Sequence, residues 1–360
     1  MKNGRNAPIL KLYPNVIPVK GYNRSLLMDL QKGTPYLVPN SLVDYLETPT
    51  AGMKEYEEFI LQNELGLFVD PELGESLAPL SLEYHPDSKI NNAILELDAY
   101  SSWDVSSVLK QLDALGARFL EIRFLDVVSF ENHFPELKKN LDNTTVEYLR
   151  IAVPFYPKLK EFLDSNLRER FFRLSTLVVY NATAGFELQT DFYNLLFTQQ
   201  ESVSHEQCGN VAVDYFVIST EGYVRNRNYN SCLAHKISVD KDGLICNCPS
   251  ETTKYGNLDV ASLEEVLSQD AFKDKWMLTK DEILVCSVCE FRWICSDCRA
   301  FTVSDLKNGK PSKCGYNPFI NLWEGDENYL SEAQCGVVVT NGAMQVDDAL
   351  IAALNLTLWE

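Results

Sequence analysis

Residues 286–298 read Cys286-Ser-Val-Cys289-Glu-Phe-Arg-Trp-Ile-Cys295-Ser-Asp-Cys298, and we call them the cysteine-rich segment. Four thiols within thirteen residues are more than core packing requires. All ten cysteines of the chain lie at or after Cys208, so the first 207 residues contain none. The pattern predicts a metal-binding segment, with the chemistry of the cysteines confined to the C-terminal part of the chain.

The composition indicates a soluble globular protein of two or three domains. The chain has 360 residues, of which 46% are hydrophobic and 11% aromatic. Residues 1–8 contain no apolar signal sequence, and no run of eighteen apolar residues occurs, so we expect a cytoplasmic protein without a membrane span. Disulfides are rare in a reducing compartment, which favours metal or redox chemistry for clustered cysteines.

The net charge indicates which class of molecule the chain binds. A formal charge of −19 opposes binding to nucleic acid, which requires a basic surface. We therefore expect a protein, peptide or small molecule as partner, and no nucleic acid.

Residues 8–75 are predicted to form a small module. Their pattern indicates a strand, a β-hairpin with Gly33 in its turn, two helices and a short strand, the order of a winged-helix-like unit. Asn40 is expected to cap the first helix, and Gly66 to end the second in the left-handed conformation. The predicted elements are the strands Leu10–Val19, Ser25–Leu30, Pro35–Pro39 and Leu67–Val69 and the helices around Leu42–Leu46 and over Lys54–Leu65.

Residues 76–205 are predicted to alternate strands with helices. Short connections between apolar strands indicate parallel pairing with right-handed crossovers, hence an α/β layer or an incomplete (β/α) barrel, since four strands do not close a full one. Gly116 is expected to end the first helix. The predicted strands are Ile90–Leu97, Arg118–Phe124, Val146–Val153 and Leu174–Tyr180, and the predicted helices are Val105–Leu115, Ser129–Leu141 and Lys158–Phe171.

The last third of the chain is rich in turns and carries every thiol. A hairpin is predicted to turn at Asp242-Gly243, which places Cys232 near one open end and Cys246 and Cys248 near the other. A short helix follows at Ser262–Leu267. We expect residues 206–323 to form one cysteine-rich domain and 324–360 an extension with a helix at Asp347–Leu356.

The spacing of the thiols resembles a known pattern. Ten residues separate Cys232 from Gly243, four separate Gly243 from Cys248, and the cysteine-rich segment reads Cys-x2-Cys-x5-Cys-x2-Cys before Cys314. This resembles the SPASM domain, the C-terminal extension of many radical-SAM peptide maturases. The family usually has three residues before the last cysteine of the segment, where this chain has two.

The resemblance implies two [4Fe–4S] clusters. One would be held by Cys286, Cys289, Cys295 and Cys314, and the other by Cys232, Cys248 and Cys298, with Cys246 or Cys208 as its fourth ligand. Thiolates are soft anionic donors that suit such clusters. Zinc accepts the same donors, and two Cys-x2-Cys units around one tetrahedral zinc remain the alternative. Cys335 is expected to be an ordinary buried thiol.

Further stretches extend the resemblance over about residues 9–323. Residues 14–31, Val38-Pro39-Asn40, 230–240 and Cys295–Ala300 resemble the SPASM-domain peptide maturase of grasp-with-spasm systems. That implies a precursor peptide for a ribosomally made, modified product, and an ATP-grasp ligase that crosslinks its side chains. The N-terminal module would then bind the leader peptide by adding it as a strand to its hairpin edge. A packing domain without a ligand is the alternative.

The radical-SAM motif itself is missing. The Cys-x3-Cys-x2-Cys loop that follows the first barrel strand in those enzymes here reads Asp98-Ala-Tyr-Ser-Ser-Trp103-Asp104. Without those thiolates we expect no S-adenosylmethionine cofactor, and a catalytically silent (β/α) section. No Gly-rich phosphate-binding motif replaces it.

Three hypotheses follow for the function. The first is an accessory maturation protein that binds the precursor peptide, carries two clusters and works with the ligase. The second is a redox or radical-type enzyme whose clusters act on the peptide. The third is a zinc-stabilised interaction protein, which would be colourless rather than brown.

Overall fold

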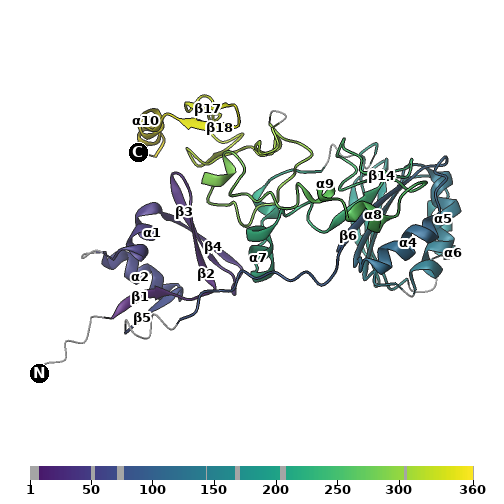
Figure 1. Cartoon of the computed structure of the whole chain (residues 1–360), viewed down its shortest axis with the longest axis horizontal. Coiled ribbons are helices and arrows are strands. Elements are labelled where there is room, and N and C mark those ends of the chain that lie inside the picture. Colours follow the sequence, from purple (N-terminus) through teal and green to yellow (C-terminus); the bar gives the residue numbers. More distant parts are fainter. Residues whose placement is uncertain are drawn as a thin grey trace, which may run out of the picture. The chain divides into compact units, whose positions relative to one another are not determined.

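The structure is a computed structural model that describes residues 8–49, 53–70, 77–142, 144–166, 171–202, 208–303 and 306–359 (Figure 1). The chain divides into two compact units. Unit 1 comprises Met1–Tyr84, Asn210–Ser231 and Leu278–Glu360, and unit 2 comprises His85–Gly209 and Cys232–Met277. The predicted boundaries near residues 75 and 205 fall outside the described residues, so the predicted domain division stays a prediction.

Unit 2 is built on a nine-stranded mixed sheet in the order β10-β11-β9-β8-β7-β6-β12-β13-β14. The predicted parallel pairing is confirmed for β6 with β7, β7 with β8 and β8 with β9, and β12 joins β6 in parallel. The α/β class is therefore confirmed, as an open sheet. The strands are β6 (Asn92–Leu97), β7 (Phe119–Phe124), β8 (Tyr148–Pro154), β9 (Leu174–Tyr180), β10 (Phe186–Gln189), β11 (Asn194–Phe197), β12 (Lys236–Val239), β13 (Leu244–Cys246) and β14 (Gly256–Asn257).

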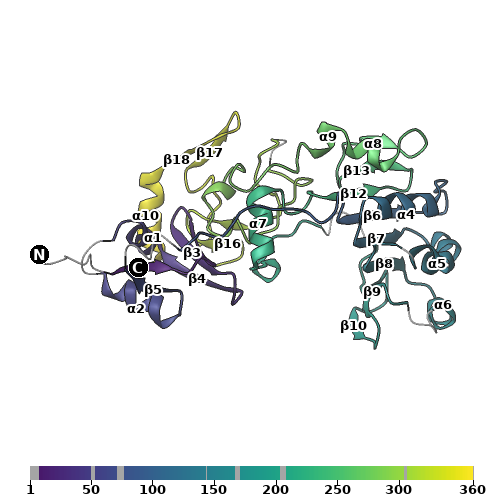
Figure 2. The ribbon, with the colours of Figure 1, turned by 60° about the horizontal axis from the view of Figure 1, so that its bottom comes forward.

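Helices cover one face of this sheet. Figure 2 shows α4 (Val105–Ala114), α5 (Val127–Leu141) and α6 (Leu159–Asn166) on the same side of β6 to β9. The Asp104 side chain caps α4 by accepting from the Ser106 backbone N–H, and Gly116 follows the helix with a φ of 80°. Alternate strand residues such as Leu95 and Ile122 enter the core beneath the helices. The predicted helix Lys158–Phe171 is present as α6, and residues 167–170 lie outside the described ones.

The predicted hairpin at Asp242-Gly243 is also confirmed. β12 pairs with β13 antiparallel, and Gly243 has the positive φ, 76°, that the turn requires. α8 (Leu263–Leu267) begins at Ser262, whose side chain forms a capping box with Glu265, and α9 (Asp270–Lys273) follows.

The N-terminal part of unit 1 contains a three-stranded antiparallel sheet and a separate strand pair. The sheet has the order β2-β3-β4, from Val16–Lys20, Arg24–Asp29 and Thr34–Pro39, and confirms the predicted hairpin with Gly33 at a φ of 66°. β1 (Ile9–Leu12) pairs with β5 (Gly66–Val69). The single strand predicted over Leu10–Val19 is therefore two strands, because a turn intervenes, with the Val16 N–H bonded to the Tyr13 carbonyl.

Two residues of this module have roles other than those predicted. α1 (Asn40–Glu47) begins at Asn40, but the Asn40 amide donates to the carbonyls of Gly21 and Tyr22 instead of capping the helix. α2 (Lys54–Gln62) ends before Gly66. Gly66 is needed in β5 because a Cβ there would lie 2.2 Å from the Lys11 carbonyl oxygen.

The rest of unit 1 consists of short elements around the cysteine-rich segment. They are the 3-10 turns η2 (Val213–Tyr215) and η3 (Cys286–Val288), α7 (Thr220–Asn228), β15 (Tyr316–Asn317), β16 (Leu322–Trp323), β17 (Val337–Thr340), β18 (Ala343–Val346) and α10 (Asp348–Trp359). The predicted C-terminal helix is thus present. In the described residues no helix has the length and apolar character needed to cross a membrane.

Candidate functional site

The cysteine-rich segment is held by local backbone bonds in unit 1. η3 closes through the bond from the Cys289 N–H to the Cys286 carbonyl, 3.0 Å, and the Cys295 N–H donates to the Phe291 carbonyl, 3.0 Å. Val285, directly before it, has a φ of 66°, which costs about 1–3 kcal/mol for a β-branched residue. Cys286 and Cys295 are buried, at 6% and 7% exposure.

A buried lysine connects two of these thiols. The Lys280 Nζ lies 3.9 Å from the Cys286 Sγ and 3.7 Å from the Cys295 Sγ, and its residue is 5% exposed. The backbone of Cys314 pairs with that of Val211 in an isolated β-bridge, and the charge of Cys314 acts on Lys280. Cys289, in the same segment, is within electrostatic range of Cys286 and Cys295. We call Cys286, Cys289, Cys295 and Cys314 the first thiol group.

The environment of the first thiol group shifts the pKa of its members. Burial raises the pKa of the Cys295 thiol to about 12, against the opposing effect of the Lys280 ammonium. Burial likewise raises the pKa of Cys286 and, more strongly, of Cys289. Burial alone lowers the pKa of Lys280, but Cys286, Cys295 and nearby Asp297 raise it above its ordinary value. The site therefore stabilises a positive charge beside sulfur.

A second set of thiols lies in unit 2 around another lysine. The Lys236 Nζ donates to the Cys232 Sγ at 3.6 Å. Burial alone lowers the pKa of Lys236, but the charges of Cys232, Cys248 and Cys208 raise it to about 12. We call these three cysteines, whose charges act on one ammonium, the second thiol group.

The remaining candidate ligands lie elsewhere. Cys246 is fully buried with its Sγ 3.2 Å from the Ser238 Oγ and 3.3 Å from the Lys254 Nζ, so its polar partners differ from those of the second thiol group. Cys298 is buried in unit 1, whereas Cys232 and Cys248 belong to unit 2, and its membership of their cluster stays a prediction. Cys335 is a buried thiol that accepts a hydrogen bond from Asn317, as expected.

The cysteine-rich segment contacts the N-terminal hairpin through a buried carboxylate. Glu290, next to Cys289, is 0% exposed and accepts from the Arg24 Nε at 2.7 Å and the Tyr316 hydroxyl at 2.5 Å. The Tyr22 N–H at the β2–β3 turn donates to the carbonyl of Val288. The hairpin of the N-terminal module is thus fastened directly to the cysteine-rich segment.

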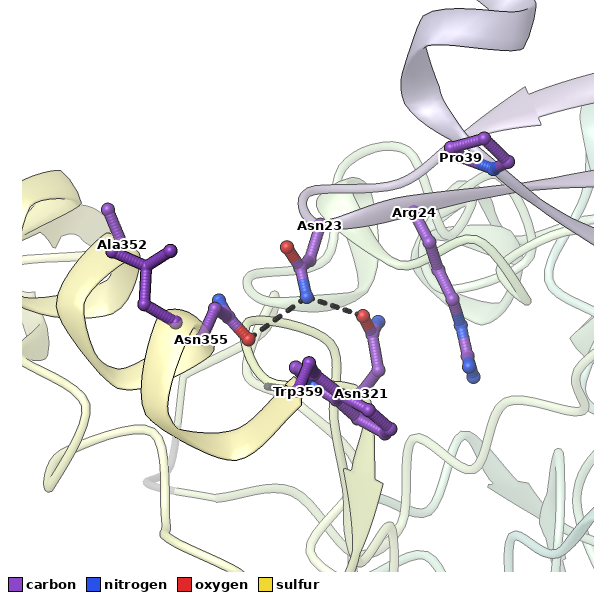
Figure 3. Close-up of a pocket in the computed structure, with 8 residues that line it drawn as sticks. Asn23, Arg24, Pro39, Asn321, Ala352, Asn355 and Trp359 are labelled. Atoms are coloured by element: carbon purple, nitrogen blue, oxygen red, sulfur yellow. Dashed lines mark hydrogen bonds between the residues drawn. The ribbon is translucent and has the colours of Figure 1, made fainter.

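A pocket of about 630 Å³ lies beside this hairpin, between it and α10 (Figure 3). At its base the Asn23 amide donates to the side-chain oxygens of Asn321, 2.6 Å, and Asn355, 3.1 Å. The Asn355 amide in turn donates to the Phe319 carbonyl. These amides hold α10 to the body of unit 1.

The donor sets are chemically suited to thiolate-ligated metal. In the part of the chain that the structure describes, no disulfide joins any of the ten cysteines, and no three His, Cys, Asp or Glu side chains converge where one ion could be held. The cysteines around a polynuclear cluster stand farther apart than the ligands of a single ion. Buried soft donors beside a cation are the features that an anionic iron–sulfur cluster needs.

Sequence reasoning did not identify the two lysines. Lys236 follows Cys232 by four residues, and this proximity could have drawn attention to it. Lys280 precedes Cys286 by six residues in a loop without periodicity, so only the tertiary structure reveals its contact with sulfur.

Comparisons with known proteins give little further information. No protein-family model matches the chain. None of the curated proteins matches it either. Among solved structures, the crystal structure of Streptococcus suis SuiB is similar with a TM-score of 0.27 and 11% sequence identity, covering 81% of this chain and 96% of that chain. A likeness of this size carries no argument about fold or function.

Proposed function

We propose that this chain is an accessory maturation protein for a ribosomally synthesised, post-translationally modified peptide. In this proposal it binds the precursor peptide, holds two [4Fe–4S] clusters in a SPASM-type domain, and works with an ATP-grasp ligase that crosslinks side chains. The observation that supports it best is the separation of the thiols into two groups, each around its own lysine. Cys208 is the proposed fourth ligand of the second cluster, in place of Cys246, because it shares the lysine of Cys232 and Cys248.

Metal analysis tests the cluster part of this proposal. Protein purified without oxygen should be brown, absorb at about 400 nm and contain about eight iron atoms per chain. A colourless protein with stoichiometric zinc and no iron would instead favour the zinc-stabilised interaction protein.

The loop that follows β6 supports a role without S-adenosylmethionine cleavage. The Ser101 hydroxyl donates to the Asp98 carboxylate at 3.2 Å, and the Ala99 N–H donates to the Asp126 carboxylate at 2.7 Å. The loop then enters α4 at its cap, Asp104, and contains no thiol. The iron-loaded protein, incubated with S-adenosylmethionine and dithionite, should therefore release no 5′-deoxyadenosine. In a separate assay, turnover of the precursor peptide by the ATP-grasp ligase should fall when this chain is omitted. Release of 5′-deoxyadenosine would favour the radical-enzyme alternative.

The proposed peptide site is the outer edge of β4. β4 is the last strand of its sheet, and its alternate residues Pro35, Leu37 and Pro39 are exposed while Val38 is buried. The backbone groups at the edge of a sheet are a template for an added strand. A leader peptide bound there would lie in the module that is fastened to the first thiol group through Arg24 and Glu290.

Leu37→Asp is expected to weaken precursor-peptide binding at least tenfold, about 1.4 kcal/mol, because it places a charge on the proposed strand edge. Leu37 is 50% exposed, so the fold should be retained. Fluorescence anisotropy with labelled precursor peptide measures the change. Phe68→Asp is the matched control, since Phe68 is 41% exposed on β5 in the other sheet of the module. Equal affinities for the two variants would contradict binding at β4.

A further inference from the structure

The buried charges around the first thiol group do not balance when its thiols are neutral. Lys280 lies 3.6 Å from the Asp297 carboxylate, but Arg299 already contacts the same oxygen at 2.5 Å. The other Asp297 oxygen accepts from the Asn230 amide at 2.6 Å. Two buried cations therefore share one buried carboxylate, which leaves one positive charge in excess.

An excess buried charge is costly unless a negative partner is present. Within the described part of the chain, the Lys280 ammonium also contacts the sulfurs of Cys286 and Cys295, at 3.9 and 3.7 Å. These sulfurs become anionic only as thiolates, the form in which cysteine binds metal. The position of Lys280 is thus explained by a negatively charged metal centre and not by the ion pair with Asp297.

The second thiol group repeats this arrangement in unit 2. Within the described residues Lys236 forms no ion pair with a carboxylate, and its hydrogen-bond partner is the Cys232 Sγ. By contrast Lys254, which contacts Cys246, is paired with Asp240 at 3.1 Å. Among the described residues, three lysines contact cysteine sulfur, and of these only Lys254 is paired with a carboxylate that no other cation shares.

We propose that Lys280 and Lys236 are the charge-balancing residues of the two metal centres, each donating N–H groups to ligand sulfur and raising the reduction potential of its own centre. Of the proposed function, this inference assumes only that the two thiol groups bind metal. Hydrogen bonds to sulfur and local net charge are established determinants of cluster potential. Each lysine is a positioning residue that acts through cysteine.

The test compares Lys280→Met and Lys280→Arg with the wild-type chain. Methionine keeps the length without the charge, and Asp297 retains Arg299 and Asn230, so the metal-free Lys280→Met protein should unfold at a urea midpoint no lower than that of the wild-type chain. In the metal-loaded full-length protein, electron paramagnetic resonance measures the ratio of reduced to oxidised metal centre at the first thiol group. At a fixed solution potential, this ratio should be at least tenfold lower in Lys280→Met than in the wild-type chain. That corresponds to 59 mV for a one-electron couple. Lys280→Arg should restore the wild-type ratio.

Controls separate this inference from a general charge effect. Lys20→Met removes the same charge from an exposed pair of unit 1 and should leave the potential unchanged. Lys236→Met should shift the second centre alone. An unchanged potential and unchanged metal loss to a chelator in Lys280→Met would overturn the inference while leaving the proposed function intact.

The identity of the metal separates the two proposals. If the wild-type chain holds zinc, the cluster part of the proposed function fails. The inference about Lys280 is then supported only if Lys280→Met loses zinc to the chelator at least tenfold faster than the wild-type chain, while Lys280→Arg loses it at the wild-type rate. A wild-type chain without any metal overturns both.

Discussion

Cys295→Ala is expected to remove about half of the iron from the anaerobically purified chain, about four of eight atoms. Cys295 is a buried member of the first thiol group and lies 3.7 Å from the Lys280 ammonium. Loss of one of the four thiolates opens the proposed cluster to solvent. It also reduces the negative charge next to the Lys280 ammonium. The second thiol group lies in the other compact unit and should keep its iron. Iron and sulfide content, with absorbance at about 400 nm, measures the loss.

Cys335→Ala is the matched control for this experiment. Cys335 is also buried, but its sulfur accepts from the Asn317 amide, and it packs in an apolar cluster that contains no member of the first thiol group. Its replacement should leave the iron content unchanged. If Cys295→Ala retained all of its iron, the assignment of Cys295 as a ligand would be wrong.

Arg24→Met is expected to lower the free energy of unfolding of the metal-free chain by about 3 kcal/mol. Glu290 is 0% exposed, and loss of the Arg24 guanidinium leaves its charge buried with only neutral donors such as the Tyr316 hydroxyl. The variant also loosens the N-terminal hairpin from the cysteine-rich segment. Urea unfolding followed by circular dichroism gives the change.

The exposed pair Lys20–Asp44 provides the comparison. Both side chains are about half exposed, and solvent screens such pairs strongly, so Lys20→Met should have little effect on stability. Adding Glu290→Gln to Arg24→Met should recover part of the lost stability, because the buried charge is then removed. A loss in Arg24→Met no larger than that in Lys20→Met would show that the buried pair does not stabilise unit 1.

Local signals predicted most regular elements correctly. The hairpin turns at Gly33 and Gly243 and the end of α4 at Gly116 follow from backbone preferences within a few residues. The strand and helix alternation of unit 2 followed from hydrophobic periodicity, which reflects a single buried face. Where the prediction failed, distant contacts decided the outcome. Gly66 is required by the approach of the Lys11 carbonyl.

α7 is a second element whose formation depends on contacts with distant residues. Its nine residues contain Gly222 and little hydrophobic periodicity, so the helix was not predicted. In the structure the Ser219 side chain caps it, the Asn226 amide donates to the Trp293 carbonyl, and Arg227 pairs with Asp281. Tertiary partners therefore supply the stability that its intrinsic propensity lacks.

The sequence by itself determined which atoms are available for chemistry, since the number, identity and spacing of the thiols are properties of the chain. It also determined the α/β pattern of unit 2, because periodicity records which side of each element is buried. Only the tertiary structure decided that the charges of Cys208, Cys232 and Cys248 act on Lys236, that Cys246 lies beside Ser238 and Lys254, and that Lys280 lies beside the sulfurs of Cys286 and Cys295. The physical reason is that the electrostatic environment of a buried group depends on neighbours brought from distant positions, which no local pattern encodes.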